Sequence, residues 1–304
     1  MPGMMVDPYG RKATGLRIAL TPRCNLSCIY CHHEGEVKPN GEISDEMVVS
    51  VAKAAAHLGL RSLKFTGGEP LLRRDLAGLI SQMPQDLDIS LTTNGIFLAD
   101  QAEGLAKAGL DRVNVSLDSL RPEVYRAITG GREGDLEKVL AGIDAAKAAK
   151  LAPIKLNVVA LKENEAEIAD LIDFCRKRGL ILQLIELLDL RGLGLSGDID
   201  AIERRLAARA DSIRTREMHR RKKYFLEGAE VEAVRPMDNT EFCANCTRLR
   251  ITSDGRIKPC LLRSDNLVDI GTCDCERIKE LLQEANARRE PYFRTNSHEY
   301  GGRN

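Results

Sequence analysis

The 304-residue sequence contains no tryptophan, and aromatic residues make up only 4% of it. Proteins that bind single-stranded nucleic acid stack its bases on aromatic side chains, so few residues here suit that function. The sequence also has no net charge, because 45 Lys and Arg residues balance 45 Asp and Glu residues. Coating nucleic acid or an anionic membrane needs excess positive charge. We therefore expect neither nucleic acid nor a membrane as a partner.

Long hydrophobic runs are missing as well. No apolar stretch reaches the ~18 residues of a membrane-spanning helix. Residues 1–12 lack the apolar core of a secretion signal, so we expect a cytoplasmic protein. Structural disulfides are rare in that compartment, and the nine cysteines therefore suggest metal binding. Six of them form two clusters, which are Cys24, Cys28 and Cys31, and Cys243, Cys246 and Cys260.

Short β-branched runs alternate with amphipathic segments between residues 16 and 187. Six units of strand followed by helix predict parallel strands joined by right-handed crossovers. The predicted strands are 16–21, 62–66, 88–93, 112–118, 153–160 and 180–187. The predicted helices are 44–58, 73–83, 99–108, 122–128, 135–150 and 164–178. This α/β pattern favours a partial (β/α)6 barrel similar to a TIM barrel, with an open doubly wound sheet as the alternative.

One face of the predicted strands is polar. Side chains alternate between the two faces of a strand, and the apolar set fits the layer that contacts the helices. The polar set then lines the barrel interior, and it includes Arg17, Lys64 and Lys155. Because unpaired buried charges are costly, we infer an anionic ligand in the interior. In the alternative, these cations lie at strand ends in solvent.

The motif Cys24-x3-Cys28-x2-Cys31 follows the first predicted strand directly. The carboxyl ends of barrel strands are where active sites lie. Three thiolates on one short loop can bind three irons of a [4Fe–4S] cluster and leave the fourth iron open. Zinc is the alternative, and since it prefers four protein ligands, His32 or His33 would complete the site.

Two motifs together resemble radical S-adenosylmethionine (SAM) enzymes. The cysteine motif reads Cys24-Asn25-Leu26-Ser27-Cys28-Ile29-Tyr30-Cys31, and Thr66-Gly67-Gly68-Glu69-Pro70 ends the next predicted strand. The resemblance implies that SAM binds the open iron and is contacted by Tyr30, Gly68 and Ser116. It also implies that one electron from the cluster cleaves SAM to a 5′-deoxyadenosyl radical, which abstracts hydrogen from the substrate.

The motif Cys243-x2-Cys246-x13-Cys260 is a second set of three thiols. Taken alone, it fits zinc as well as a cluster, with Cys273 or Cys275 as a fourth zinc ligand. If they bind no metal, Cys273 and Cys275 form a solvent-facing pair.

The segment from Phe242 to Leu261, which includes Arg248 and Arg250, resembles the C-terminal cluster region of GTP 3′,8-cyclases. These are the radical SAM lyases of the first step of molybdenum cofactor biosynthesis, and the likeness is to their archaeal branch. It extends from about residue 15 to about residue 270. We therefore expect a radical SAM barrel over residues 1–232 and an auxiliary-cluster and GTP-binding region over residues 233–304.

The resemblance to GTP 3′,8-cyclases implies two [4Fe–4S] clusters, one on each cysteine triplet. The second cluster's open iron would meet the guanine. The implied GTP contacts are Arg17, Lys64, Thr92, Lys155, Arg248 and Arg250. The implied reaction takes the hydrogen at C3′ of GTP, joins C3′ to C8 and gives 3′,8-cyclo-7,8-dihydro-GTP. The implied partners are a low-potential electron donor and a downstream enzyme, cyclic pyranopterin monophosphate synthase.

Three features depart from the family pattern or fall outside it. Bacterial members end in a Gly-Gly tail that reaches into the site, whereas Gly301-Gly302 here is followed by two more residues. Leu188 stands where many relatives have a Met near SAM. The basic run 214–223 predicts a solvated hairpin or a partner-facing surface, with phosphate binding as the alternative.

Two other functions fit parts of the sequence. A radical SAM enzyme that modifies peptides could also carry a second cluster, but a peptide does not require Arg248-x-Arg250 or the interior cations. A non-enzymatic zinc-binding module would hold zinc and no iron. The zero net charge and the polar strand layer weigh against a nucleic-acid-binding form of such a module.

Overall fold

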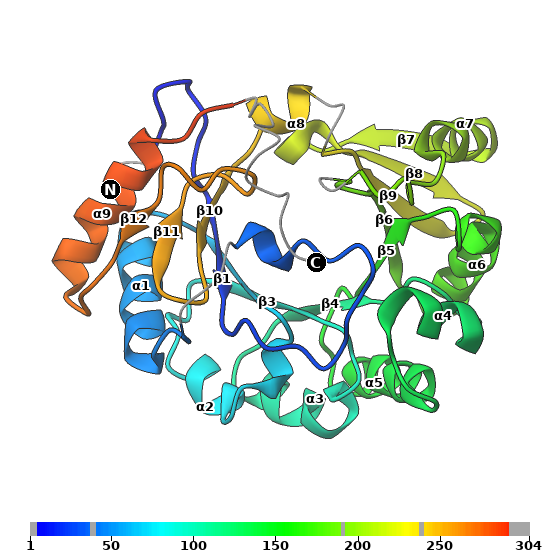
Figure 1. Ribbon diagram of the computed structural model, residues 1–304, viewed down its shortest axis with the longest axis horizontal. Helices are drawn as coiled ribbons and strands as arrows, with labels where there is room; N and C mark the ends of the chain where they lie inside the picture. The colour runs from blue at the N-terminus through cyan, green and yellow to red at the C-terminus, as the bar shows by residue number, and fades with distance from the viewer. Residues whose placement is uncertain (1–4, 37–40, 190–191, 237–239, 292–304) are drawn as a thin grey trace.

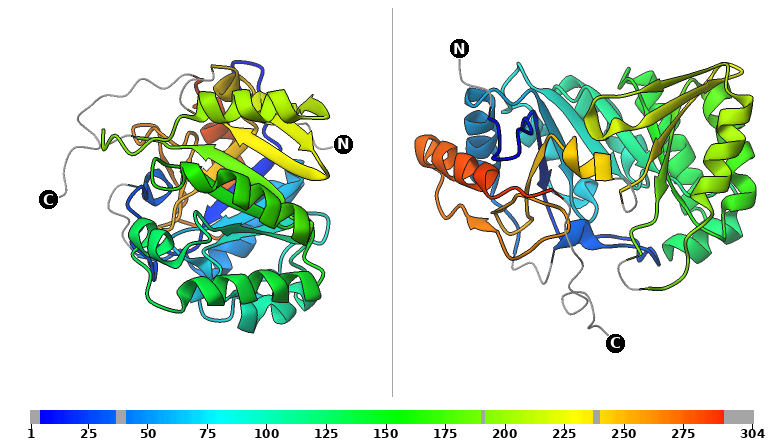
Figure 2. Two further views of the ribbon diagram at one scale, coloured as in Figure 1. Left: turned by 90° about the vertical axis from the view of Figure 1, so that its right-hand side faces the viewer. Right: turned by 90° about the horizontal axis from the view of Figure 1, so that it is seen from above.

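The structure is a computed structural model that describes residues 5–36, 41–189, 192–236 and 240–291. Its described strands form one curved sheet of 12 strands (Figure 1). The helices that follow the central strands lie on the outer side of this curve, as the two turned views also show (Figure 2). The helices that follow the central strands therefore cover the convex side of the sheet (Figure 1, Figure 2).

Eight parallel strands make up the centre of the sheet. In spatial order they are β10 (Arg248–Ile251), β1 (Gly15–Ala19), β2 (Ser62–Thr66), β3 (Asp88–Thr93), β4 (Arg112–Ser116), β5 (Lys155–Ala160), β6 (Ile181–Glu186) and β9 (Ala229–Val234). Antiparallel strands extend both sides, β11 (Arg256–Lys258) and β12 (Val268–Asp269) beyond β10, and β8 (Lys222–Leu226) and β7 (Ser212–Thr215) beyond β9. The order from β1 to β6 never reverses, unlike that of a doubly wound sheet. The edges β12 and β7 do not pair, so the described strands form a partial barrel.

The helices match the predicted alternation with the strands. They are α1 (Asp45–His57), α2 (Leu76–Ile80), α3 (Leu98–Lys107), α4 (Pro122–Thr129), α5 (Asp135–Ala148), α6 (Ile168–Arg178), α7 (Ile199–Arg209), α8 (Thr240–Ala244) and α9 (Cys275–Ala287), with short 3₁₀ turns η1 (His33–Gly35), η2 (Pro70–Leu72), η3 (Glu165–Glu167) and η4 (Met218–Arg220). Ser44 caps α1 by accepting from the Met47 N–H at 3.2 Å, as a helix start requires. The second helix is shorter than the predicted 73–83. It starts after Asp75, whose side chain caps α2 by accepting from the Gly78 N–H at 3.0 Å, and it ends at Ile80.

The core lies between the strands and the outer helices. Ile18, Phe65, Leu91, Val115 and Leu156 are fully buried there, each on the apolar side of its strand. The predicted alternation of apolar and polar faces is therefore confirmed.

The C-terminal region continues the same sheet. Strand β10 pairs in parallel with β1, so that Gly15 lies opposite Arg248 and Arg17 lies opposite Arg250. This pairing was not predicted, because 228 residues lie between the two strands. The division of the chain between residues 232 and 233 stays a prediction.

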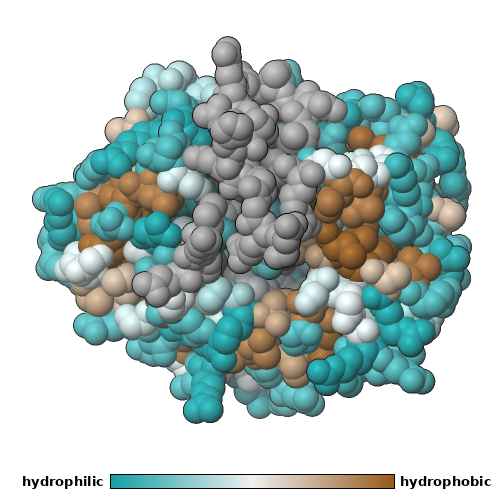
Figure 3. All heavy atoms as spheres, viewed as in Figure 1, coloured by the Kyte–Doolittle hydropathy of each residue, from teal (hydrophilic) through white to brown (hydrophobic). Residues whose placement is uncertain are grey.

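In the described part of the chain, no helix combines the length and apolarity that a membrane crossing requires. The face shown in Figure 1 is mostly hydrophilic, with apolar residues gathered in patches on its left and right (Figure 3).

Two helical glycines provide a test of the outer packing. A Cβ at Gly142 in α5 would lie 2.6 Å from the Gly95 carbonyl oxygen and 3.0 Å from Leu98 Cβ, whereas a Cβ at Gly104 in α3 would meet nothing within 4 Å. We expect Gly142→Ala to lower the free energy of unfolding by about 1–3 kcal/mol, because α5 must move away from α3. Gly104→Ala should raise it by about 0.5–1 kcal/mol. Urea unfolding measures both, and equal midpoints would contradict this account.

Candidate active site

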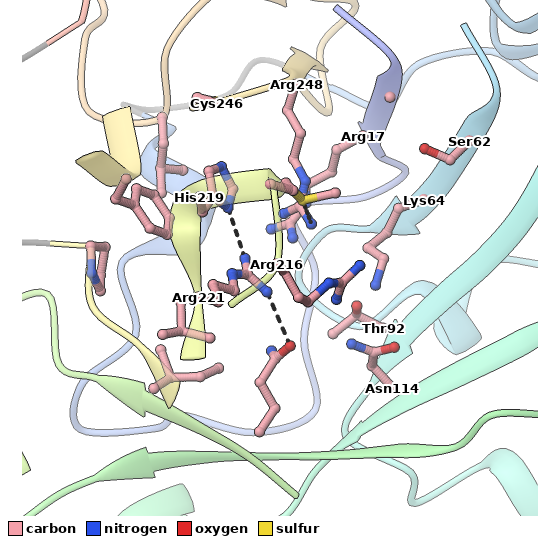
Figure 4. Close-up of a pocket in the computed structure, with 18 of the residues that line it drawn as sticks. Arg17, Ser62, Lys64, Thr92, Asn114, Arg216, His219, Arg221, Cys246 and Arg248 are labelled. Carbon is pink, nitrogen blue, oxygen red and sulfur yellow. Dashed lines mark hydrogen bonds between the residues drawn. The ribbon is translucent and has the colours of Figure 1, made fainter. Parts of the chain in front are cut away.

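The concave side of the sheet encloses a cavity of about 850 Å³. Twelve Lys and Arg side chains line it, against three Asp and Glu side chains (Figure 4). Such an excess of positive charge suits an anionic ligand.

All six residues implied as GTP contacts line this cavity. They are Arg17, Lys64, Thr92, Lys155, Arg248 and Arg250. The sheet register explains why they meet: Arg17 lies opposite Lys64 on one side and Arg250 on the other. Thr92 and Lys155 both lie opposite Asn114, which stands between them on β4. Parallel strands in register therefore turn residues far apart in sequence into one polar layer.

Two of the three interior cations have protein partners that the sequence did not reveal. Arg17 Nη1 lies 3.2 Å from a carboxylate oxygen of Glu34, and Lys155 forms an ion pair with Glu232. A ligand is thus not needed to neutralise Arg17, whereas Lys155 shares the Glu232 carboxylate with two arginines. Lys64 has no carboxylate partner among the described residues, and burial, Arg17 and Arg248 lower its pKa well below the ordinary value. Lys64 is the interior cation for which the inference of an anionic ligand still holds.

Glu232 on β9 is the centre of a charge network. It is fully buried and pairs with Lys155, with Arg216 Nη1 at 3.0 Å and with Arg221 Nη1 at 3.2 Å. Burial alone would raise the pKa of Glu232, but Lys155, Arg221 and Arg216 lower it to about 2. The carboxylate therefore stays ionised and holds three cations at one wall of the cavity.

We define the basic hairpin as β7, η4 and β8 (residues 212–226). Several of its cationic side chains line the cavity. Arg214, Arg216, Arg221 and Lys223 line the cavity wall. Lys222, in contrast, is exposed and does not line it. The expectation of a solvated or partner-facing hairpin is therefore wrong for the buried Arg221 and for Arg216, because both pair with Glu232 on β9. Arg214 lines the cavity but is exposed.

His219 links this hairpin to the second cysteine motif. Its Nδ1 lies 3.0 Å from Arg221 Nη2, and since a guanidinium only donates hydrogen bonds, Nδ1 accepts. Burial and Arg221 lower the pKa of His219, so the ring is neutral with its proton on Nε2. The ring stacks on Phe242 with centroids 3.8 Å apart. Sequence reasoning saw no partner for this histidine, because the partners lie in other segments.

The second cysteine motif forms part of the cavity wall, since Cys243, Cys246 and Cys260 all line it. Burial would raise the pKa of Cys246, but Arg250 and Arg289 bring it below the ordinary value. None of the three forms a disulfide with another described residue. This donor set fits an iron–sulfur cluster, whose ligands must be thiolates.

Three residues from opposite ends of the chain fix the loop of the second cysteine motif. Arg11 Nη1 donates to the Cys243 carbonyl at 3.0 Å, and Arg289 donates to the Cys246 carbonyl. Asp7 joins the two arginines, at 2.7 Å from Arg11 and 3.4 Å from Arg289. Nothing in the sequence pattern indicated this clamp.

The first cysteine motif lies on the loop after β1, outside the lining of the 850 Å³ cavity. None of its three cysteines forms a disulfide among the described residues, and the Leu26 and His33 N–H groups donate to Cys24 Sγ and Cys31 Sγ, each at 3.4 Å. Burial, Asp118 and the other two thiols raise the pKa of Cys28 to about 12. A positively charged metal would offset this penalty, so the triplet fits a cluster. No three His, Cys, Asp or Glu side chains among the described residues are grouped as a single metal ion requires.

Gly67 and Gly68 of the motif at residues 66–70 pack against the loop that carries the first cysteine motif. A Cβ at Gly68 would lie 2.1 Å from the Arg23 carbonyl oxygen, and one at Gly67 would lie 2.5 Å from that of Thr21. The Gly68 N–H donates to the Thr21 carbonyl at 2.7 Å. Backbone contact between the two loops, which the sequence did not reveal, therefore requires glycine at both positions. Glu69 also contacts the loop after β3, where it accepts a hydrogen bond from the Asn94 N–H at 2.7 Å.

The other two residues implied as SAM contacts lie near the carboxyl end of β4. The Tyr30 hydroxyl donates to Asp118 at 2.7 Å, and Ser116 is the last residue of β4. Burial raises the pKa of Asp118 to about 6. The Val159 N–H holds its other oxygen at 2.8 Å. The sequence places Asp118 on the polar side of its predicted strand with Ser116, but it did not indicate the hydrogen bond to Tyr30.

Leu188 and the Cys273 and Cys275 pair differ in where they lie relative to the cavity. Leu188 lines the cavity. Cys273 and Cys275 do not line it, and Cys275 Sγ lies 3.8 Å from His57 Nδ1 on the outer helix α1. Gly301 and Gly302 lie outside the described residues.

Family models match most of the chain. The Radical SAM superfamily model matches residues 18–175, and the Molybdenum Cofactor Synthesis C model matches residues 182–295. A Methanosarcina mazei protein named "Probable GTP 3′,8-cyclase" is 52% identical over 301 residues, which cover 95% of this chain and 90% of that protein. The chain belongs to the GTP 3′,8-cyclase family of the radical SAM superfamily. A family member of the same name from Archaeoglobus fulgidus is 48% identical, covering 96% of this chain and all of that protein. The predicted family is confirmed.

Solved structures share the fold of this family member. Native anSMEcpe with bound AdoMet has a TM-score of 0.59 and 18% identity, and the match covers 90% of this chain and 81% of that chain. SuiB of Streptococcus suis, bound to S-adenosylmethionine, has a TM-score of 0.61 and 18% identity over 83% of this chain and 61% of that chain. The predicted radical SAM partial barrel is confirmed.

The Glu232 network makes stability depend on pH. The pKa of Glu232 is about 2 in the folded protein, below its ordinary value of 4.5, so its stabilising effect is complete above pH 4.5 and is lost as pH falls toward 2. We expect Glu232→Gln to lower the free energy of unfolding at pH 7 by about 3 kcal/mol, and by less as pH falls through this window. Urea unfolding across pH measures the difference.

The matched control is Glu230→Gln, on the same strand. Glu230 is partly exposed and pairs with Lys223 alone, so we expect a change below about 1 kcal/mol. A loss for Glu232→Gln that stays constant between pH 7 and pH 3 would disprove the proposed linkage.

Proposed function

We propose that the protein catalyses the SAM-dependent radical cyclisation of GTP to 3′,8-cyclo-7,8-dihydro-GTP. The observation that carries this proposal is the joint lining of one cavity by an excess of cations and by the three cysteines of the second motif. A nucleoside triphosphate presents both an anionic chain and a base, and this cavity offers a partner for each. The family of the chain supports the same activity.

We assign the cofactors to the two cysteine motifs. As a radical SAM protein it uses SAM and an iron–sulfur cluster, which we place on Cys24, Cys28 and Cys31. We place a second [4Fe–4S] cluster on Cys243, Cys246 and Cys260, where it would meet the guanine. When bound, the first cluster supplies the electron that cleaves SAM to a 5′-deoxyadenosyl radical. Hydrogen bonds from the Leu26 and His33 N–H groups to two of the sulfurs would tune its potential.

The SAM contacts follow from the loops around the first motif. Gly68 would contact SAM through its backbone, which packs directly on the cysteine loop at Arg23. Tyr30 is held by its hydrogen bond to Asp118, and Ser116 stands at the adjacent strand end. Together they would orient SAM toward the cavity.

The cavity residues would position GTP for cyclisation. Arg17, Lys64 and Lys155 bind phosphate oxygens, and guanidinium groups suit phosphate because they donate in a fork. Thr92 adds a hydroxyl from the same polar layer, and Arg248 and Arg250 contact GTP beside the second motif. A fixed triphosphate and a fixed guanine would hold C3′ near C8, which is the proximity that ring closure needs. We further propose a low-potential electron donor and a downstream cyclic pyranopterin monophosphate synthase as partners.

Isotope transfer provides the direct test. We expect anaerobically reconstituted protein, given SAM, a strong reductant and GTP deuterated at C3′, to place deuterium in 5′-deoxyadenosine, as mass spectrometry would show. ATP deuterated at C3′ is the control and should give none. SAM cleavage without deuterium transfer would refute GTP as the hydrogen donor and favour a peptide-modifying enzyme.

Iron content tests the two cluster assignments. Replacing Cys243, Cys246 and Cys260 by serine should leave about four of about eight irons per chain, since each [4Fe–4S] cluster needs its own thiolates. Replacing Cys24, Cys28 and Cys31 should likewise remove one cluster. The control is Cys273→Ser, which should keep all the iron. Zinc instead of iron in wild-type protein, or iron loss in the control, would contradict these assignments.

A further inference from the structure

Arg216 of the basic hairpin is a cavity residue that none of the implied GTP contacts includes. Its Nη1 pairs with Glu232 at 3.0 Å, and its side chain is 36% exposed. Figure 4 shows the side chain extending from the hairpin into the cavity. Among the described residues, its side chain pairs only through Nη1, so Nε and Nη2 remain available to a ligand. A half-exposed guanidinium held at one nitrogen is suited to bind an anion with the others.

Arg221 has a different role from Arg216. Its side chain is 7% exposed, and its two terminal nitrogens contact Glu232, Gln183 and His219. Those contacts leave Arg221 little capacity for a ligand. It acts as a positioning residue that fixes one side of Glu232.

The charge balance at this wall points to an anionic ligand. One carboxylate, Glu232, pairs with three cations, so two positive charges are uncompensated within the group. Lys155 is 14% exposed and Arg216 is more accessible, so the uncompensated charge meets the cavity through these two side chains. Arg216 suits a phosphate better than Lys155 does, because its planar guanidinium can donate to two phosphate oxygens at once.

We propose that Arg216 binds the phosphate chain of GTP together with Lys155, and that Glu232 and Arg221 position both cations. This inference rests on the proposed function. It makes Arg216 a specificity residue that distinguishes a nucleoside triphosphate from a monophosphate, because only the longer chain supplies oxygens for this additional cation. It also gives the basic run of the sequence a role within the site.

The test compares nucleotides that differ only in phosphate number. Equilibrium binding of GTP and GMP to anaerobically reconstituted protein is measured for wild type, Arg216→Ala and Arg216→Lys. We expect Arg216→Ala to weaken GTP binding by about 10- to 100-fold, the range for a hydrogen-bonded charge pair, and to leave GMP binding within about twofold. Arg216→Lys should recover part of the loss, since it keeps the charge but not the fork.

The matched control is Lys222→Ala, in the same basic run but exposed and outside the cavity lining. It should leave both affinities unchanged. Equal losses of GTP and GMP affinity in Arg216→Ala would overturn the proposal, because a general distortion of the site would explain them. Unchanged GTP affinity would overturn it as well.

Inorganic triphosphate separates this inference from the proposed function. If the wild type binds no GTP, the proposed function fails. The phosphate subsite is then judged by the binding of inorganic triphosphate alone, which Arg216→Ala should weaken and Lys222→Ala should not. Arg216-independent binding of that probe, or none at all, would reject the subsite.

Discussion

Repulsion among like charges on the concave side of the sheet is the constraint that the rest of the structure must satisfy. Parallel register brings Arg17, Lys64 and Arg250 to neighbouring positions, and a ligand-free protein must tolerate their charges. Two buried carboxylates supply the compensation. Glu34 pairs with Arg17, and Glu232 pairs with Lys155 and two hairpin arginines. Both carboxylates have a pKa of about 2, as expected for groups surrounded by cations. The incomplete compensation is what leaves the cavity receptive to an anion.

Glu34 and Glu232 connect the cavity to the two cysteine loops through their positions and hydrogen bonds. Glu34 lies three residues after Cys31, so the first cysteine loop and the cavity share a side chain. Glu232 orients Arg221, which in turn fixes the tautomer of His219 against Phe242, the residue before Cys243. The hydrogen bonds that balance charge in the cavity therefore also set the position of the loops that we assign to the clusters.

The sequence predicted the local structure well and the long-range contacts poorly. Period-two alternation identified the strands from β1 to β6 and their polar face, since that signal lies within a few neighbouring residues. It could not place β10 beside β1, or Glu232 beside Lys155, because pairing between distant segments leaves no periodic trace. The hairpin shows the same limit. Its charge was visible in the sequence, but the ion pairs of Arg216 and Arg221 with Glu232 on β9, and the exposure of Lys222, were not.

The two cysteine loops differ in electrostatic environment, and the difference fits different tasks. At the first loop, burial and Asp118 oppose ionisation of Cys28, so thiolate formation there depends on the charge that a metal brings. At the second loop, Arg250 and Arg289 already favour the Cys246 thiolate, and the loop borders the cation-rich cavity. The cysteines of the first loop lie outside the cavity lining, whereas those of the second loop are part of it. The loop that we assign to SAM therefore reaches the cations that we assign to GTP through Glu34, which pairs with Arg17, and not through its cysteines.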